Sequence, residues 1–144
     1  MGSGKGKSKG GGGSSRQASS KLPTLSSRED LERAIKEASE KANEANKKGH
    51  LILLKFTADW CSVCRKISPF CEGLPNDPKV SNSDRLFSLY KVDVDESPDL
   101  TNFYGASALP LFVFLVDGKK ADTLVGAQQT ALKKKIMKHT ASKK

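Results

Sequence analysis

A run of six residues at positions 51–56 constrains the fold most. Five of the six are large and apolar, and two cysteines, Cys61 and Cys64, follow almost at once. A short, nearly continuous apolar run is typical of a central strand that is buried on both faces of a sheet. The sequence therefore predicts an α/β fold in which the cysteines lie where this strand hands over to a helix.

Hydrophobic spacing and turn residues predict the other elements. We expect a short edge strand at 22–25, a helix from Ser26 or Ser27 to Gly49, and a helix that begins at the cysteines and runs through Pro69. The remaining elements are an irregular stretch at 72–84 with one helical turn near 77–80, a strand at 86–94, a helix at 97–104, a hairpin of strands 111–116 and 121–125, and a final helix at 128–139. This order predicts a mixed central β-sheet flanked by helices on both faces.

The charge is unevenly distributed along the chain. The 144 residues carry 25 Lys and Arg against 16 Asp and Glu, but residues 1–21 and 132–144 hold eleven of the basic residues and no acid. The middle of the chain, with 14 basic and 16 acidic residues, is slightly acidic. A core that binds nucleic acid is therefore not expected. The longest apolar stretch has eight residues, far fewer than the ~20 that a membrane span needs, so we expect one soluble domain.

The ends of the chain differ in composition from its middle. Residues 1–21 are rich in Gly, Ser and Lys, which predicts a disordered basic tail. The folded domain is expected at 22–140, followed by a basic end at 141–144. The tail contains no apolar segment of a secretory signal, so we expect the protein in the cytoplasm, with an organellar transit peptide as the alternative.

The cysteine motif points to redox chemistry. A thiol at the start of a helix meets unpaired N–H groups and the positive end of the helix dipole, which lower its pKa below ~8.5. Cys61 is therefore the expected nucleophile, and Cys64, one turn further and more buried, the resolving cysteine. A metal site is not expected, because zinc needs four ligands and Cys71, His50 and His139 lack paired spacing.

The segment at residues 56–69, with Trp60 beside the motif, resembles the active-site segment of the thioredoxin family, and the resemblance extends over about 22–140. Further landmarks of the family recur in order: residues 91–95 are similar to its third strand, residues 108–112 to its cis-proline loop, and Gly118 and Gly126 to its hairpin turn and late glycine.

This resemblance implies a thioredoxin fold and a monomeric thiol-disulfide oxidoreductase without a bound cofactor. Such an enzyme reduces protein disulfides and is recharged by a thioredoxin-reductase-type electron donor. Trp60 and Pro110 would form an apolar platform for the substrate, and Leu109 would offer its backbone to an extended substrate segment. A cis bond between Leu109 and Pro110 is also implied, at small cost for a proline.

Three departures from the family pattern leave alternatives open. Ser62 and Val63 replace the usual Gly-Pro pair, which favours a less reducing couple and an isomerase or oxidase as one alternative. Residues 76–80 look more like the thioredoxin-like domains of membrane-linked disulfide reductases. Lys55 stands where the family usually has a buried Asp. Lys55 either modulates the pKa of the cysteines or extends to a strand edge or a carboxylate, and its presence favours the other alternative, a redox-inert interaction module.

Three other features have weaker interpretations. Cys71 is expected to pack at the end of the second helix, with a regulatory thiol as the alternative. The acidic residues between Asp93 and Asp99 are expected at a solvated strand end, and Lys133 to Lys135 on a solvated helix face.

Overall fold

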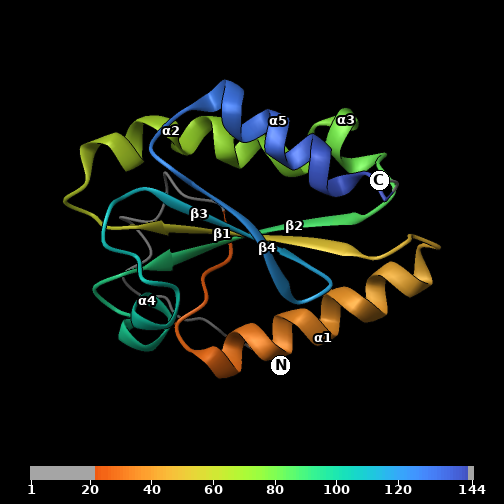
Figure 1. The fold of residues 1–144 in the computed structure, drawn as a ribbon, viewed down its shortest axis with the longest axis horizontal. Coiled ribbons are helices and arrows are strands. Elements are labelled where there is room, and N and C mark those ends of the chain that lie inside the picture. The colour runs from red at the N-terminus through yellow and green to blue at the C-terminus, as the bar shows by residue number, and fades with distance from the viewer. Residues whose placement is uncertain (1–21, 143–144) are drawn as a thin grey trace, which may run out of the picture.

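The computed structural model describes residues 22–142, which form one mixed sheet of four strands in the order β2-β1-β3-β4 (Figure 1). The predicted tail at 1–21 and the last two residues lie outside the described part of the chain. β1 pairs parallel with β2 and antiparallel with β3, and β3 pairs antiparallel with β4. The strands are β1 (His50–Thr57), β2 (Leu86–Asp93), β3 (Leu111–Val116) and β4 (Lys119–Val125).

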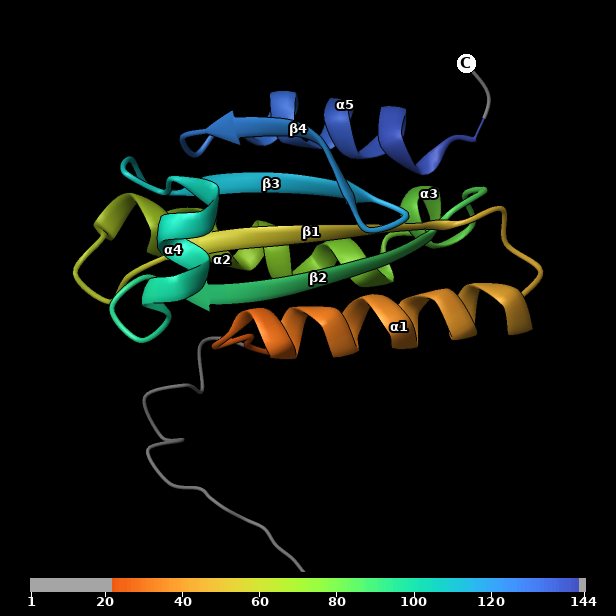
Figure 2. The ribbon, with the colours of Figure 1, turned by 60° about the horizontal axis from the view of Figure 1, so that its bottom comes forward.

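Helices cover both faces of this sheet, as the sequence predicts. α2 (Ser62–Gly73), α3 (Pro78–Ser81) and α5 (Gln129–Thr140) lie on one side, and α1 (Arg28–Glu44) and α4 (Pro98–Tyr104) lie on the other (Figures 1 and 2). Because β1 is central, its side chains alternate between two buried layers. Leu51 and Leu53 pack beneath α2 and α5, whereas Ile52, Leu54 and Phe56 pack against α1 and α4.

The first helix begins where the capping pattern predicts and ends earlier than expected. The hydroxyl of Ser27 accepts a hydrogen bond of 3.0 Å from the backbone N–H of Asp30, which caps α1. The predicted end at Gly49 is wrong, because the helix ends at Glu44. Asn46 adopts a φ of 60°, a left-handed conformation that Asn tolerates better than most residues and that stops the helix.

The predicted edge strand at 22–25 is reduced to a single bridge between Thr24 and Lys91. Pro23 has no N–H to extend a ladder, so pairing does not continue. The stretch after α2 contains a short 3₁₀ turn, η3 (Leu74–Asn76), before the predicted helical turn α3. The hairpin turn at Asp117 and Gly118 is as predicted, with β4 beginning two residues early.

None of the helices in the described part of the chain is long and apolar enough to cross a membrane.

Candidate functional site

The two cysteines of the motif lie at the junction of β1 and α2. Cys61 has an extended backbone and is the N-cap of α2, and its Sγ accepts a hydrogen bond of 3.3 Å from the backbone N–H of Cys64. The sequence predicts this arrangement, because the buried strand β1 must end before the helix can begin. The helix N-terminus therefore directs the Cys64 N–H and its positive dipole end at the sulfur of Cys61.

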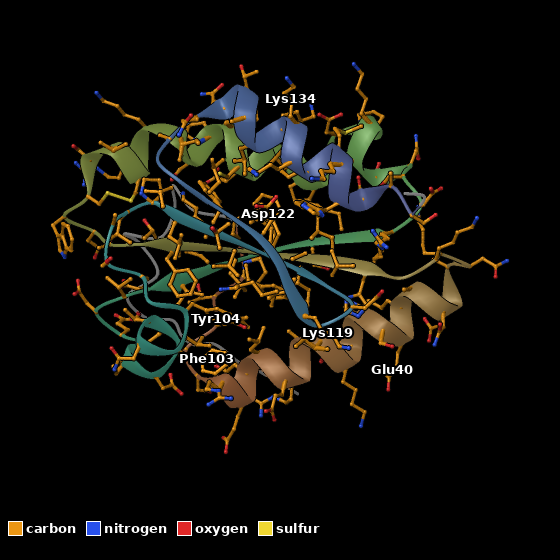
Figure 3. All side chains as sticks on the ribbon, in the orientation of Figure 1. Glu40, Phe103, Tyr104, Lys119, Asp122 and Lys134 are labelled. Atoms are coloured by element: carbon orange, nitrogen blue, oxygen red, sulfur yellow. A yellow bond between two sulfur atoms is a disulfide. The ribbon has the colours of Figure 1, made fainter. Side chains whose placement is uncertain are left out.

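Cys61 and Cys64 form a disulfide, drawn in yellow in Figure 3, with their Cα atoms 5.3 Å apart. This separation is within the range for disulfides, so the helix turn brings the two thiols together without backbone distortion. Cys61 retains 8% of its exposed surface and Cys64 retains none. Cys61 is therefore the more accessible residue of the pair, although both are buried.

Trp60 lies on the surface beside the disulfide. Its side chain is 68% exposed, and its indole Nε1 donates a hydrogen bond of 2.9 Å to Oδ2 of Asp95. Val63, in the first turn of α2, is also exposed. The sequence singled out neither of these residues for the site: Asp95 is one of the acids assigned to a solvated strand end, and Val63 was considered only for its effect on the redox couple.

The proline loop lies against the same pair of cysteines. The bond between Leu109 and Pro110 is cis, and Leu109 packs against the small buried cluster of Ala58, Cys61 and Cys64. The backbone of Leu109 has no hydrogen-bond partner within residues 22–142. Pro110 is itself buried, and its carbonyl accepts a hydrogen bond of 2.8 Å from Gly126. The exposed apolar surface at this site therefore comes from Trp60 and Val63 rather than from the proline ring.

Lys55 lies beneath the second cysteine. Only 2% of the residue is exposed, and its Nζ donates hydrogen bonds to Oγ of Ser68 at 2.8 Å and to the carbonyl of Cys64 at 3.4 Å. Burial lowers the pKa of this amine below its usual value. Of the alternatives left open by the sequence, extension to a strand edge is wrong, because the side chain ends inside the protein under α2.

Two other features are placed clearly. Cys71 is fully buried, and burial raises the pKa of its thiol to about 11. The predicted solvated face at Lys133 to Lys135 is only partly correct. Lys133 pairs with Asp77 at 2.6 Å and Lys135 with Asp122 at 2.9 Å, so two of the three lysines fasten α5 to its neighbours. No cluster of three or more metal-binding side chains occurs within the described ranges.

A redox-capable cysteine pair at the start of the helix after a central strand, with a cis-proline loop against it, defines the class of thiol-disulfide oxidoreductases. The family model named Thioredoxin matches residues 33–138, and the chain belongs to the thioredoxin family.

Individual relatives agree with this assignment. Thioredoxin H4 of Arabidopsis thaliana is 44% identical over 101 residues, which cover 70% of this chain and 78% of that protein. The solved thioredoxin of Fasciola hepatica is 36% identical with a TM-score of 0.63, over 82% of this chain and 99% of that one. Malassezia sympodialis thioredoxin is 30% identical with a TM-score of 0.66, over 85% and 93% of the two chains. The predicted thioredoxin fold is confirmed.

Proposed function

We propose that this chain reduces disulfide bonds in other proteins, with Cys61 as the attacking cysteine and Cys64 as the resolving one. The observation that carries the proposal is the position of Cys61 in the Cys61–Cys64 disulfide: it is the N-cap of α2 and retains 8% exposure, whereas Cys64 is fully buried. At the helix N-cap, a thiolate is stabilised by backbone N–H groups.

The reaction begins from the reduced pair. The Cys61 thiolate attacks one sulfur of the substrate disulfide, which forms a mixed disulfide and releases the first substrate thiolate. Cys64 then loses its proton and attacks Sγ of Cys61, which forms the Cys61–Cys64 disulfide and releases the second substrate thiolate. Two electrons pass from the two cysteines to the substrate, whose two thiolates take up protons from water.

The surface around Cys61 supports binding of an extended, partly apolar substrate segment. Trp60 and Val63 offer exposed apolar surface on one side of the cysteine. Leu109 packs against Cys61 with unpaired backbone groups, which are available to pair with a substrate strand as an added edge does. These residues are the proposed substrate contacts, and Pro110 fixes the direction of the loop from within the protein.

The oxidised protein must be reduced again before another cycle. We propose that a separate reductase of the thioredoxin-reductase type donates two electrons to the disulfide, and that residues 22–140 carry out the cycle as one monomeric unit. Two buried layers on the faces of a single sheet support this unit.

Insulin reduction with dithiothreitol as the electron source tests the proposal. The wild type should accelerate precipitation of the insulin chains, and Cys61→Ser should fall to the rate of dithiothreitol alone. Cys71→Ala is the matched control, because it removes the third thiol outside the motif and should retain activity. A wild type without turnover would favour the inert interaction module.

The same protein should be equilibrated with glutathione mixtures. A potential near ~−270 mV supports a reductase, whereas a value near ~−180 mV or above supports the isomerase or oxidase that Ser62 and Val63 allow.

A further inference from the structure

Lys55 is the one charged residue among the largest fully buried side chains of residues 22–142, and the reaction outlined above does not use it. A buried lysine is costly, because desolvation disfavours its charged form, so a protein retains one only where neighbours compensate. Its position is central: it lies on β1, the middle of the sheet, on the face that α2 covers.

The charged and titratable groups around Lys55 come from two elements. On β2, Lys91 is the register partner of Lys55, and the positive charge of Lys91 disfavours the charged form of Lys55. On α2, Cys64, Cys71 and Glu72 face it, and the negative charge of Glu72 favours its charged form, whereas Cys71 remains a neutral thiol. On β3, its register partner is the apolar Phe112.

The Lys55 amine acts as the donor in both of its hydrogen bonds. Ser68 Oγ donates to the carbonyl of Cys64 at 3.1 Å, so that hydroxyl can only accept from the Lys55 amine. The same carbonyl accepts a second bond from Lys55 at 3.4 Å. These two acceptors suit an ammonium group, which has three donors and no acceptor. A neutral amine would carry a lone pair that neither of them can satisfy. These bonds fix Nζ beside the Cys64 carbonyl and the Ser68 hydroxyl, within the first two turns of α2.

Glu72 supplies the negative charge that this interior otherwise lacks. It lies one turn beyond Ser68 on α2, and its Oε2 is buried without a hydrogen-bond partner among residues 22–142. A buried, unpartnered carboxylate oxygen is expensive unless a nearby positive charge stabilises it. Glu72 makes no direct ion pair with Lys55, so its influence is through space.

We propose that Lys55 is a positioning residue whose buried ammonium, with Glu72 as countercharge, stabilises the thiolate of Cys64 in the reduced protein. This inference rests on the proposed function, because it assigns a control element to the resolving step. Cys64 loses its proton to water, the thiolate remains beneath the helix start, and it then attacks Cys61 Sγ as described above. Nothing else in the electron balance changes.

The direction of the effect follows from the charge. Stabilising one thiolate favours the reduced pair, so Lys55 makes the couple more oxidising than the same site without it. A buried acid at this position would act in the opposite sense, because a negative charge disfavours a nearby thiolate.

The test replaces Lys55 by methionine, which has similar length and no charge. In a Cys61→Ser background, the pKa of Cys64 is read from the ultraviolet absorbance of the thiolate as pH rises, and should increase by about one unit in Lys55→Met. With both motif cysteines present, Lys55→Met should shift the glutathione equilibrium about tenfold toward the oxidised pair, which is ~30 mV more negative.

Leu53→Met is the matched control, because Leu53 lies on the same strand and face and carries no charge. It should change neither the Cys64 titration nor the equilibrium. A purely structural role for Lys55 would lower stability in denaturant and leave the two electrochemical readouts unchanged, and that result would overturn the proposal.

Lys55→Gln keeps the proposal testable if Lys55→Met does not fold. Glutamine keeps hydrogen-bond donors but carries no charge, so the pKa of Cys64 should rise as in Lys55→Met, and no movement, or a decrease, overturns the assignment. Insulin turnover by the wild type is measured separately. Active wild type with unchanged titrations rejects only the role of Lys55, whereas inactive wild type rejects the reductase itself.

Discussion

Trp60 is exposed to solvent yet fixed at one end, because its indole nitrogen donates a hydrogen bond of 2.9 Å to the Asp95 carboxylate. Trp60 follows β1 and Asp95 follows β2, and these parallel neighbours end at the same edge of the sheet. The bond therefore holds the ring beside Cys61 before a substrate arrives, which reduces the entropy lost on binding.

Asp95→Ala should weaken substrate binding more than the chemical step. Loss of one hydrogen bond to a charged acceptor, screened by solvent, costs about 1 kcal/mol, so KM for insulin should rise about fivefold with a smaller change in kcat. Steady-state turnover measures both constants. Glu96→Gln, which neutralises the neighbouring acid, is the control and should leave KM within twofold of the wild type. An equal effect of the two variants would assign the loss to net charge.

The acid stability of the fold should depend on Asp122, which lies on β4 beneath α5 (Figure 3). Burial by itself would raise the pKa of this carboxyl, but hydrogen bonds from His139 and Lys135 outweigh it and lower the pKa to about 2. The folded pKa lies below the unfolded value, so the ionised carboxylate stabilises the fold above about pH 4. That contribution is lost as pH falls from about 4 through 2.

Asp122→Asn should therefore lower the free energy of unfolding by about 1 kcal/mol at pH 7, since partial exposure screens the pair. The difference from wild type should disappear near pH 2. Urea unfolding at several pH values measures it. Lys134→Gln is the control: Lys134 lies on the outer side of the same helix (Figure 3) and should have no effect at any pH. A deficit that persisted at pH 2 would mean lost packing.

Local signals explain why much of the fold was predictable. The apolar run of β1, the Ser27 cap and the Asp117-Gly118 turn each depend on a few adjacent residues, and the structure contains all three. The end of α1 was mistaken because the sequence offers two residues that tolerate left-handed backbone, and the helix stops at the first, Asn46, rather than at Gly49.

The contacts of the site were less predictable, because they join residues that are distant in sequence. The bond between Trp60 and Asp95 exists only because β1 and β2 are neighbours, and the hydrogen bonds of Lys55 depend on how α2 is rotated over the sheet. The burial of Pro110 depends likewise on packing against residues from other elements. Composition and spacing carry no information about such relationships.

Gly49→Ala should destabilise the protein by about 2 kcal/mol or more. Gly49 has a φ of 133°, which side chains rarely tolerate, and a Cβ placed there would lie 2.6 Å from Oδ1 of Asp117. That same oxygen accepts a hydrogen bond of 3.0 Å from the N–H of His50, so it cannot move away freely. Urea unfolding at neutral pH provides the measurement.

Two further variants separate the clash with Asp117 from the backbone strain in the Gly49→Ala effect. Gly73→Ala should be neutral or slightly stabilising, because Gly73 has helical backbone angles and open space around its Cα. Asp117→Gly removes the clash together with the hydrogen bond from His50 N–H, so Gly49→Ala is also measured in an Asp117→Gly background, where its cost should be smaller than in the wild type. An equal cost in both backgrounds would assign the effect to the strain of the backbone alone.

Cys71 should be distinguishable from Cys61 by its reactivity. It has no solvent exposure, and burial raises the pKa of its thiol to about 11, so very little thiolate forms at pH 8. After mild reduction, an alkylating reagent should therefore modify Cys61 and spare Cys71 in the folded protein, and should modify all three cysteines in denaturant. Mass spectrometry counts the additions, and peptide mapping identifies the sites. Rapid modification of Cys71 in the folded state, at a rate close to that of Cys61, would contradict its burial and favour the regulatory thiol that the sequence left as an alternative.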